Sequence, residues 1–200
     1  TDGTVTEVRA ENVIVCAGSQ PVEFPIDGLH PDRVLTNENL FELTEVPAKI
    51  VLIGGGPISL EMATAFRDLG SEVAIVELLD RVISTEDPLV SSTIEAALRE
   101  RGVEVFTGTS IERFSGNSAH LGDGRTIADV DQVLLAVGRR PKLTDLGLDV
   151  AGVDHTERGI TADTFGRTNV DGIYAVGDVT GNTLTTHGAN SIGRRAIRAI

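Results

Sequence analysis

The stretch KIVLIGGGPISLEMA, residues 49–63, places three consecutive glycines between a run of apolar, mostly β-branched residues and a segment with helical periodicity. Residues 49–53 predict a short buried strand, and from Ile58 onward apolar residues recur at helical spacing until Gly70 ends the helix. The glycines therefore lie at a strand-to-helix turn. The missing side chains would let a pyrophosphate approach the backbone there, and the free amides at the helix start would attract its charge.

This turn matches the pattern G-x-G-x-x-G only in part. Gly54 and Gly56 occupy the first two positions, and Ser59 occupies the third, where a small side chain still permits fairly close packing of the helix. Pro57 fits the first helical turn, where no amide hydrogen bond is lost. A glycine turn that merely connects a strand to a helix remains the alternative.

The segments that follow complete a repeating pattern. Residues 71–77 predict a second strand that ends at Glu77, about 20 residues beyond the turn, where an acid can accept a hydrogen bond from a ribose hydroxyl. Residues 86–102 predict a second helix with Asp87 as its cap, and residues 103–108 predict a third strand. Strand, helix, strand, helix, strand in this order predicts a dinucleotide-binding half with a parallel sheet.

One closing pattern occurs twice. Short strands around the hairpin signal at residues 123–124 lead into a hydrophobic strand that ends at Gly138. Earlier, Asp2 and Gly3 stand at a similar turn, residues 13–15 predict a strand, and Gly18 ends the segment. In both copies a proline follows the final glycine three residues later. The chain therefore has two such endings and one glycine-rich opening, unless two common hairpins match by coincidence.

A third strand ending lies near the carboxyl terminus. Residues 173–176 predict a strand, followed by Gly177 and Asp178 and then by a helix from about Thr186. An acid at the carboxyl end of a parallel strand lies where open α/β sheets bind ligands, so Asp178 is a candidate partner for a polyol hydroxyl. From these residues alone, an ordinary Gly-Asp turn is the alternative.

Composition excludes several classes of partner. The formal net charge of −13 argues against nucleic acid, which requires clustered basic side chains. No apolar run approaches the roughly 20 residues of a membrane span, so we expect a soluble protein without a membrane partner. Cys16 is the only cysteine and the four histidines lack ligand spacing, so we expect no disulfide within the chain, no metal site and a cytoplasmic location. We expect Cys16, in a hydrophobic segment, to be buried.

Taken together, four segments in order resemble the flavin-dependent pyridine-nucleotide disulfide oxidoreductases, the group that contains dihydrolipoamide dehydrogenase, glutathione reductase and mercuric reductase. They are VIVCAGSQP (13–21), VLIGGGPISLEMA (51–63), LLAVGRRP (134–141) and TNVDGIYAVGDV (168–179). The resemblance implies an α/β fold in which a Rossmann-like NAD-binding domain, a parallel sheet plus an antiparallel β-meander, is inserted into part of an FAD-binding domain. The insertion would span 47–141, and 1–46 and 142–200 would be the FAD-domain segments.

The resemblance also implies roles for residues of the insertion. Gly54, Gly56 and Ser59 match the turn at the NAD pyrophosphate, and Glu77 matches the acid at the adenosine ribose. Gly138 belongs to the loop beneath the nicotinamide side of the cofactor. A further match is Glu61, which corresponds to a helix glutamate near flavin and nicotinamide, with an ordinary exposed helix position as the alternative.

In the flanking segments, Gly18, Gly177 and Asp178 match FAD-binding motifs, with Asp178 at the ribityl chain. The helix from Thr186 resembles one whose amino end faces the flavin pyrimidine, where its dipole would favour negative charge. The neighbouring His187 is interpreted as a residue that caps or lines that turn, with a role as an acid or base as the alternative.

Three positions depart from the family pattern. Pro57 borders the cofactor turn where several relatives have an aromatic or aliphatic residue that covers the flavin, which puts that gating in doubt. Ala17 replaces a common threonine, and Ser59 replaces glycine or alanine.

The implied function is that of an NADH/NAD-coupled flavoprotein oxidoreductase of the dihydrolipoamide dehydrogenase type. Hydride would pass between nicotinamide and FAD, and electrons would continue to a disulfide outside this sequence. Enzymes similar to mercuric reductase or ferredoxin reductase are alternatives, and a non-catalytic NAD-binding module is an alternative of another class. Leu78, Leu79 and Ser84 stand where NADP-using relatives commonly place basic side chains, which favours NAD.

A full-length member of this group also carries its own FAD-binding glycine turn, a redox Cys-x-x-x-x-Cys and a dimerisation domain with a catalytic histidine. None of these motifs occurs among the 200 residues, so we expect the sequence to correspond to the middle of such an enzyme. No catalytic residue is therefore assigned. We expect FAD binding by the isolated chain to be weak or absent, and homodimerisation to occur through the missing domain.

Overall fold

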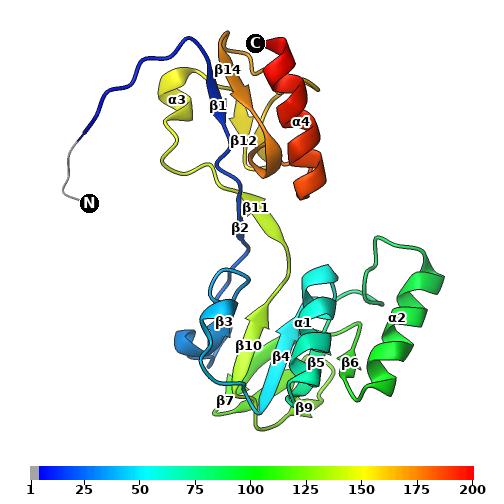
Figure 1. Cartoon of the computed structure of the whole chain (residues 1–200). Helices are drawn as coiled ribbons and strands as arrows, with labels where there is room; N and C mark the ends of the chain where they lie inside the picture. Colours follow the sequence, from blue (N-terminus) through cyan, green and yellow to red (C-terminus); the bar gives the residue numbers. More distant parts are fainter. Residues whose placement is uncertain (1–4) are drawn as a thin grey trace. The chain divides into compact units, whose positions relative to one another are not determined.

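The computed structural model describes residues 5–200, which form two compact units (Figure 1). The inserted unit comprises residues 21–138. The flanking unit comprises residues 5–20 together with 139–200. The turn expected at Asp2 and Gly3 lies outside the described residues.

A five-stranded parallel sheet forms the centre of the inserted unit, in the order β3-β10-β4-β5-β6. Its strands are β3 (Val34–Leu35), β10 (Gln132–Leu135), β4 (Lys49–Ile53), β5 (Glu72–Val76) and β6 (Glu104–Phe106). The strand, helix, strand, helix, strand pattern predicted from the sequence is confirmed, with β4, β5 and β6 side by side. Because the strands are parallel, the carboxyl ends of β4 and β5 meet at one edge, where the glycine turn and Glu77 follow.

Two different layers cover the faces of this sheet. Helices α1 (Pro57–Asp68) and α2 (Pro88–Glu100) cover one face (Figure 1). Ile50 and Leu52 of β4 belong to the buried hydrophobic cluster on that side. The alternate residues Val51 and Ile53 pack on the other face against an antiparallel meander of β7 (Ile111–Ser115), β8 (Ser118–Leu121) and β9 (Thr126–Ile127). Successive side chains of β4 point to opposite faces of the sheet, and both faces are covered, so the strand contributes to two hydrophobic cores.

The segment before β4 packs with the inserted unit, which begins at residue 21. The start of the NAD-binding domain at 47, expected from the sequence, stays a prediction. The strand β3 extends the sheet beside β10. Beside it, the guanidinium of Arg33 donates to the carbonyls of Asp131 at 3.1 Å and Gly116 at 3.0 Å, and also to that of Val130. These contacts with distant loops fix the segment to the unit.

The flanking unit is held together by β1 (Val13–Val15), which pairs in parallel with β14 (Ile173–Ala175). The strands β2 (Ser19–Pro21) and β11 (Arg139–Pro141), which follow Gly18 and Gly138, pair with each other, so the two copies of the closing pattern meet.

The remaining elements of this unit are α3 (Leu148–Ala151), the hairpin of β12 (His155–Thr156) and β13 (Gly159–Ile160), and α4 (Thr186–Ala199). Three short 3-10 helices, Pro31–Arg33, Leu40–Glu42 and Gly177–Thr180, complete the described structure. Within residues 5–200, no helix has the length and apolar character that a bilayer crossing requires.

Candidate nucleotide site

The three glycines of the turn have different surroundings. Gly54 has φ +104°, and a Cβ there would lie 2.6 Å from the carbonyl oxygen of Ala136, so the close approach of the two backbones requires glycine. At Gly55 a Cβ would lie 3.0 Å from the Glu77 side chain and 3.1 Å from Cα of Val82. Around Gly56, in contrast, a Cβ would meet no atom within 4 Å. The turn is therefore packed at its first two glycines and open at the third.

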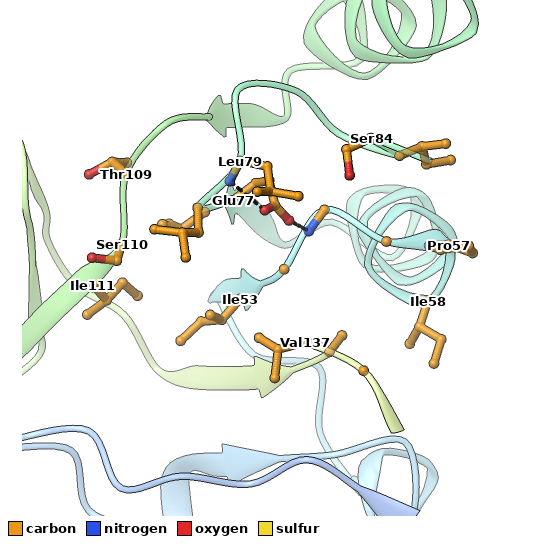
Figure 2. Close-up of a pocket in the computed structure, with 18 of the residues that line it drawn as sticks. Ile53, Pro57, Ile58, Glu77, Leu79, Ser84, Thr109, Ser110, Ile111 and Val137 are labelled. Carbon is orange, nitrogen blue, oxygen red and sulfur yellow. Dashed lines mark hydrogen bonds between the residues drawn. The ribbon is translucent and has the colours of Figure 1, made fainter. Parts of the chain in front are cut away.

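Glu77 directly follows β5, and its carboxylate is held by two main-chain donors (Figure 2). The N–H of Leu79 donates to Oε1 at 2.7 Å, and the N–H of Gly55 donates to Oε2. A carboxylate has about four acceptor positions, so two such bonds fix its orientation and leave capacity for a ligand hydroxyl. The acid and the glycine turn are thus joined before any ligand binds.

Both features face a cleft of about 650 Å³, a size typical of small-molecule sites. It is lined by residues 53–58, 76–79, 83–85, 109–111 and 136–138, together with Phe24 and Ile26, all from the inserted unit. Figure 2 shows apolar side chains such as Ile53, Ile111 and Val137 around the space beside Glu77. The lining therefore suits a ligand with a sizeable apolar part and few polar anchors.

The cleft has little charge of its own. Glu77 is the one charged residue among those that line it. Nearby, Arg81 donates to the carbonyl of Ser84 at 2.9 Å and lies 3.7 Å from a carboxylate oxygen of Asp80. An anionic ligand would therefore be attracted by main-chain amides and by the amino end of α1 and not by a basic side chain.

Five of the residues predicted from the sequence line this cleft: Gly54, Gly56, Pro57, Glu77 and Gly138. Two others do not. Ser59 is fully buried behind the turn, and its Oγ has no hydrogen-bond partner among the described residues. Glu61 is exposed on α1, and its role near flavin stays a prediction.

The remaining predicted residues belong to the flanking unit. Asp178 follows β14, where its Oδ2 accepts a 2.6 Å hydrogen bond from the hydroxyl of Ser19, and Arg139 donates to that hydroxyl at 2.8 Å. Gly177 has φ +80°, and a Cβ there would lie 3.2 Å from the side chain of Ala189 in α4, which indicates a packing role.

The other flanking positions border turns. Gly18 has φ +74°, so its turn favours glycine. Thr186 is the first residue of α4, whose cap is the preceding Thr185, and both Thr186 and His187 are exposed. Their roles toward a flavin stay predictions.

The expectation that Cys16 is buried is wrong: the side chain is exposed. The last paired residue of β1 is Val15, opposite Ala175, and Cys16 lies beyond this register. Ile14 and Val15 pack against the core clusters of the flanking unit, whereas no strand of the described chain covers Cys16.

Sequence reasoning missed several cleft residues. Thr109, Ser110 and Ile111 follow β6, and the end of a third parallel strand was a signal for them. Phe24 and Ile26 had no comparable signal, since they precede the first strand of the expected domain. Residues 5–200 hold no cluster of three or more potential metal ligands.

A parallel sheet, a glycine turn and an acid after the second strand, the latter two on one cleft, are features typical of dinucleotide-binding α/β domains. Comparison with known families agrees, because the model of the pyridine nucleotide-disulphide oxidoreductases matches residues 1–193. The chain belongs to this family.

Curated relatives and solved structures are similar over nearly the whole chain. The dihydrolipoyl dehydrogenase of Chlorobaculum tepidum is 38% identical over 209 residues, covering 100% of this chain and 44% of that protein. A dihydrolipoyl dehydrogenase of Bacillus subtilis is 36% identical over 92% of this chain and 41% of its own length. The structure of LpdA from Mycobacterium tuberculosis superposes with a TM-score of 0.88 at 30% identity, over 99% of this chain and 44% of that one. The HOCl-induced flavoprotein disulfide reductase RclA from Escherichia coli gives a TM-score of 0.85 at 30% identity, over 94% and 44%. The chain thus spans less than half the length of these relatives.

Proposed function

We propose that the inserted unit binds NAD(H) in its cleft, as part of a flavoprotein oxidoreductase of the dihydrolipoyl dehydrogenase type. The observation that carries this proposal is the open side of Gly56 next to the fixed carboxylate of Glu77, within one cleft. A pyrophosphate fits the space that a side chain at residue 56 would fill, and the Gly56 N–H has no acceptor within residues 5–200. Glu77 would accept a hydrogen bond from the adenosine ribose.

The same residues favour NADH over NADPH. A 2′-phosphate would meet the negative charge of Glu77, and phosphate recognition requires donors such as a bidentate arginine. Leu78 and Leu79 offer no side-chain donor. Arg81 does not line the cleft, and its guanidinium instead contacts Asp80 and the carbonyl of Ser84. We expect the dissociation constant for NADH to be at least about tenfold lower than that for NADPH.

The flanking unit would contribute to an FAD site through Asp178. Asp178 is half-buried. The Ser19 hydroxyl holds its Oδ2, while Oδ1 accepts no hydrogen bond from the described residues, so Oδ1 would accept one from a ribityl hydroxyl. Bound FAD would supply the electron acceptor for hydride from nicotinamide. This chain's residues would bind and orient the two cofactors, and the disulfide substrate would be a dithiol/disulfide couple such as lipoyl groups. We further propose a cytoplasmic location and a homodimeric full-length protein.

Titration calorimetry of the 200-residue chain with NADH and NADPH tests the nucleotide assignment. Preferential binding of NADH supports it, and equal or tighter binding of NADPH contradicts it. The absorbance spectrum of the full-length protein tests the enzyme assignment. A flavin spectrum supports it, whereas a colourless protein that binds NADH favours a non-catalytic NAD-binding module.

A further inference from the structure

The loop between Glu77 and α2 contains a strained residue at the cleft. Ile83 has φ +46°, in the left-handed region that β-branched residues rarely adopt. Its side chain lines the cleft and packs in part against the core beneath the helices. Such strain persists only where the surroundings enforce it, and it concentrates at functional sites.

Neighbouring contacts enforce this conformation on both sides of Ile83. Val82 is fully buried, and its carbonyl accepts a hydrogen bond from the Ser91 hydroxyl in α2. The carbonyl of Ile83 itself accepts from the N–H of Glu86 at 2.9 Å. The guanidinium of Arg81 holds the carbonyl of Ser84 at 2.9 Å. The main chain at Ile83 is therefore fixed independently of its own side chain.

This conformation directs one hydrogen bond to the glycine turn. The N–H of Ile83 donates to the carbonyl of Gly55 at 2.8 Å. That carbonyl and the N–H of Gly56 belong to the same planar trans peptide, so they point in opposite directions. Holding the Gly55 carbonyl therefore aims the Gly56 N–H away from Ile83, toward the side of the turn where a Cβ would meet no atom.

We propose that Ile83 is a positioning residue for dinucleotide binding, and this rests on the proposed function. Its main-chain N–H, held in place by the left-handed backbone, keeps the Gly55–Gly56 peptide in the orientation in which the Gly56 N–H donates to the pyrophosphate. The Glu77 carboxylate accepts from the N–H of Gly55, and the Ile83 N–H donates to the carbonyl of Gly55. Gly55 is therefore held at both of its main-chain polar groups. The pyrophosphate donor and the ribose acceptor are thus connected through Gly55.

Two variants separate the main-chain N–H from the side chain. Ile83→Pro removes the N–H and cannot adopt a positive φ, whereas Ile83→Asn also loses the apolar side chain but keeps the N–H and tolerates the left-handed region. We expect Ile83→Pro to weaken ADP-ribose and NADH by about tenfold or more and adenosine by less than about twofold. Ile83→Asn should weaken ADP-ribose by clearly less than Ile83→Pro does, because it keeps the main-chain N–H and loses only the side chain that lines the cleft.

Calorimetry measures ADP-ribose and NADH, and NMR titration measures the weaker adenosine. Equal losses for ADP-ribose and adenosine, or equal losses in both variants, would overturn the positioning role, because a general structural effect does not distinguish the pyrophosphate. If the wild type binds neither NADH nor ADP-ribose, the proposed function itself fails. If it binds both and Ile83→Pro binds equally well, only the positioning role fails.

Amide measurements on the wild type keep the proposal testable if Ile83→Pro does not fold. The Ile83 amide should be protected from hydrogen exchange before ligand is added, and the Gly56 amide should shift more with ADP-ribose than with adenosine. Exchange of the Ile83 amide at the rate of a free loop, or equal shifts with both ligands, would overturn the role.

Discussion

Replacing Glu77 by glutamine removes the one charge of the cleft with little change in side-chain shape. In the wild type both carboxylate oxygens accept main-chain hydrogen bonds, from Leu79 and Gly55. Glutamine keeps one acceptor oxygen and turns an –NH₂ group toward the other donor, so it loses one anchor as well as the charge. The ribose hydroxyl would then meet a neutral and less firmly held acceptor.

The expected cost follows from the hydrogen bonds involved. A hydrogen bond to a charged group contributes about 1.5–3 kcal/mol, so losing the ionic acceptor should raise the Kd of NADH by about tenfold to about a hundredfold. For NADPH the substitution also removes an unfavourable interaction, because the repulsion between Glu77 and the 2′-phosphate disappears. Its affinity should therefore fall less than that of NADH, or rise. The preference for NADH should therefore narrow in Glu77→Gln.

Calorimetric titration with both nucleotides measures the ratio of the Kd of NADPH to that of NADH. Thermal unfolding of each variant shows whether the protein is still folded. Glu100→Gln is the matched control, because it makes the same charge change at an exposed position on α2 that does not line the cleft. An unchanged ratio in Glu77→Gln would mean that this carboxylate faces solvent and does not select the cofactor.

Other predictions concern the turn, the core and the meander. Gly56→Ala should weaken NADH binding and leave the urea unfolding midpoint nearly unchanged, because a Cβ at residue 56 meets no protein atom. Gly54→Ala should lower the unfolding midpoint, because a Cβ at residue 54 meets the backbone of Ala136 and the residue has a positive φ. Ser59→Ala should raise the free energy of unfolding by about 1 kcal/mol in urea titrations, since it removes a buried hydroxyl without a partner; destabilisation would contradict this. The Asp123 carboxyl, hydrogen-bonded to Arg125, has a pKa lowered from 3.8 to about 2, so this pair stabilises the fold above about pH 4 and the effect is lost as the pH falls toward 2. NMR titration should show the pKa of Asp123 rising toward 3.8 in Arg125→Ala, and an unchanged pKa would refute the contact.

Periodicity and turn residues were sufficient to predict the centre of the inserted unit. The apolar run in residues 49–53 and the caps of α2, with Asp87 accepting from Leu89 and Gly102 after the helix, are local signals, and the structure confirms them. The acid after β5 was predicted by its distance from the glycine turn. Its side chain lines the cleft, and its contact with a ribose stays a prediction.

Features that depend on distant contacts were not predictable. The strand β3 has two residues, too few for a periodic pattern, and joins the sheet through β10, about 100 residues away in sequence. The strain at Ile83 is also invisible in the sequence, because the buried loop and α2 impose it. Cys16 was expected to be buried from its hydrophobic neighbours, although its exposure depends on where the pairing of β1 with β14 ends.

A crystal structure of the 200-residue chain with bound NADH tests the central claim most directly. We predict density in the cleft of the inserted unit, with a pyrophosphate oxygen within hydrogen-bond distance of the Gly56 N–H and an adenosine ribose hydroxyl within hydrogen-bond distance of Glu77. Nucleotide bound elsewhere, or bound in the cleft with its ribose away from Glu77, would contradict the account.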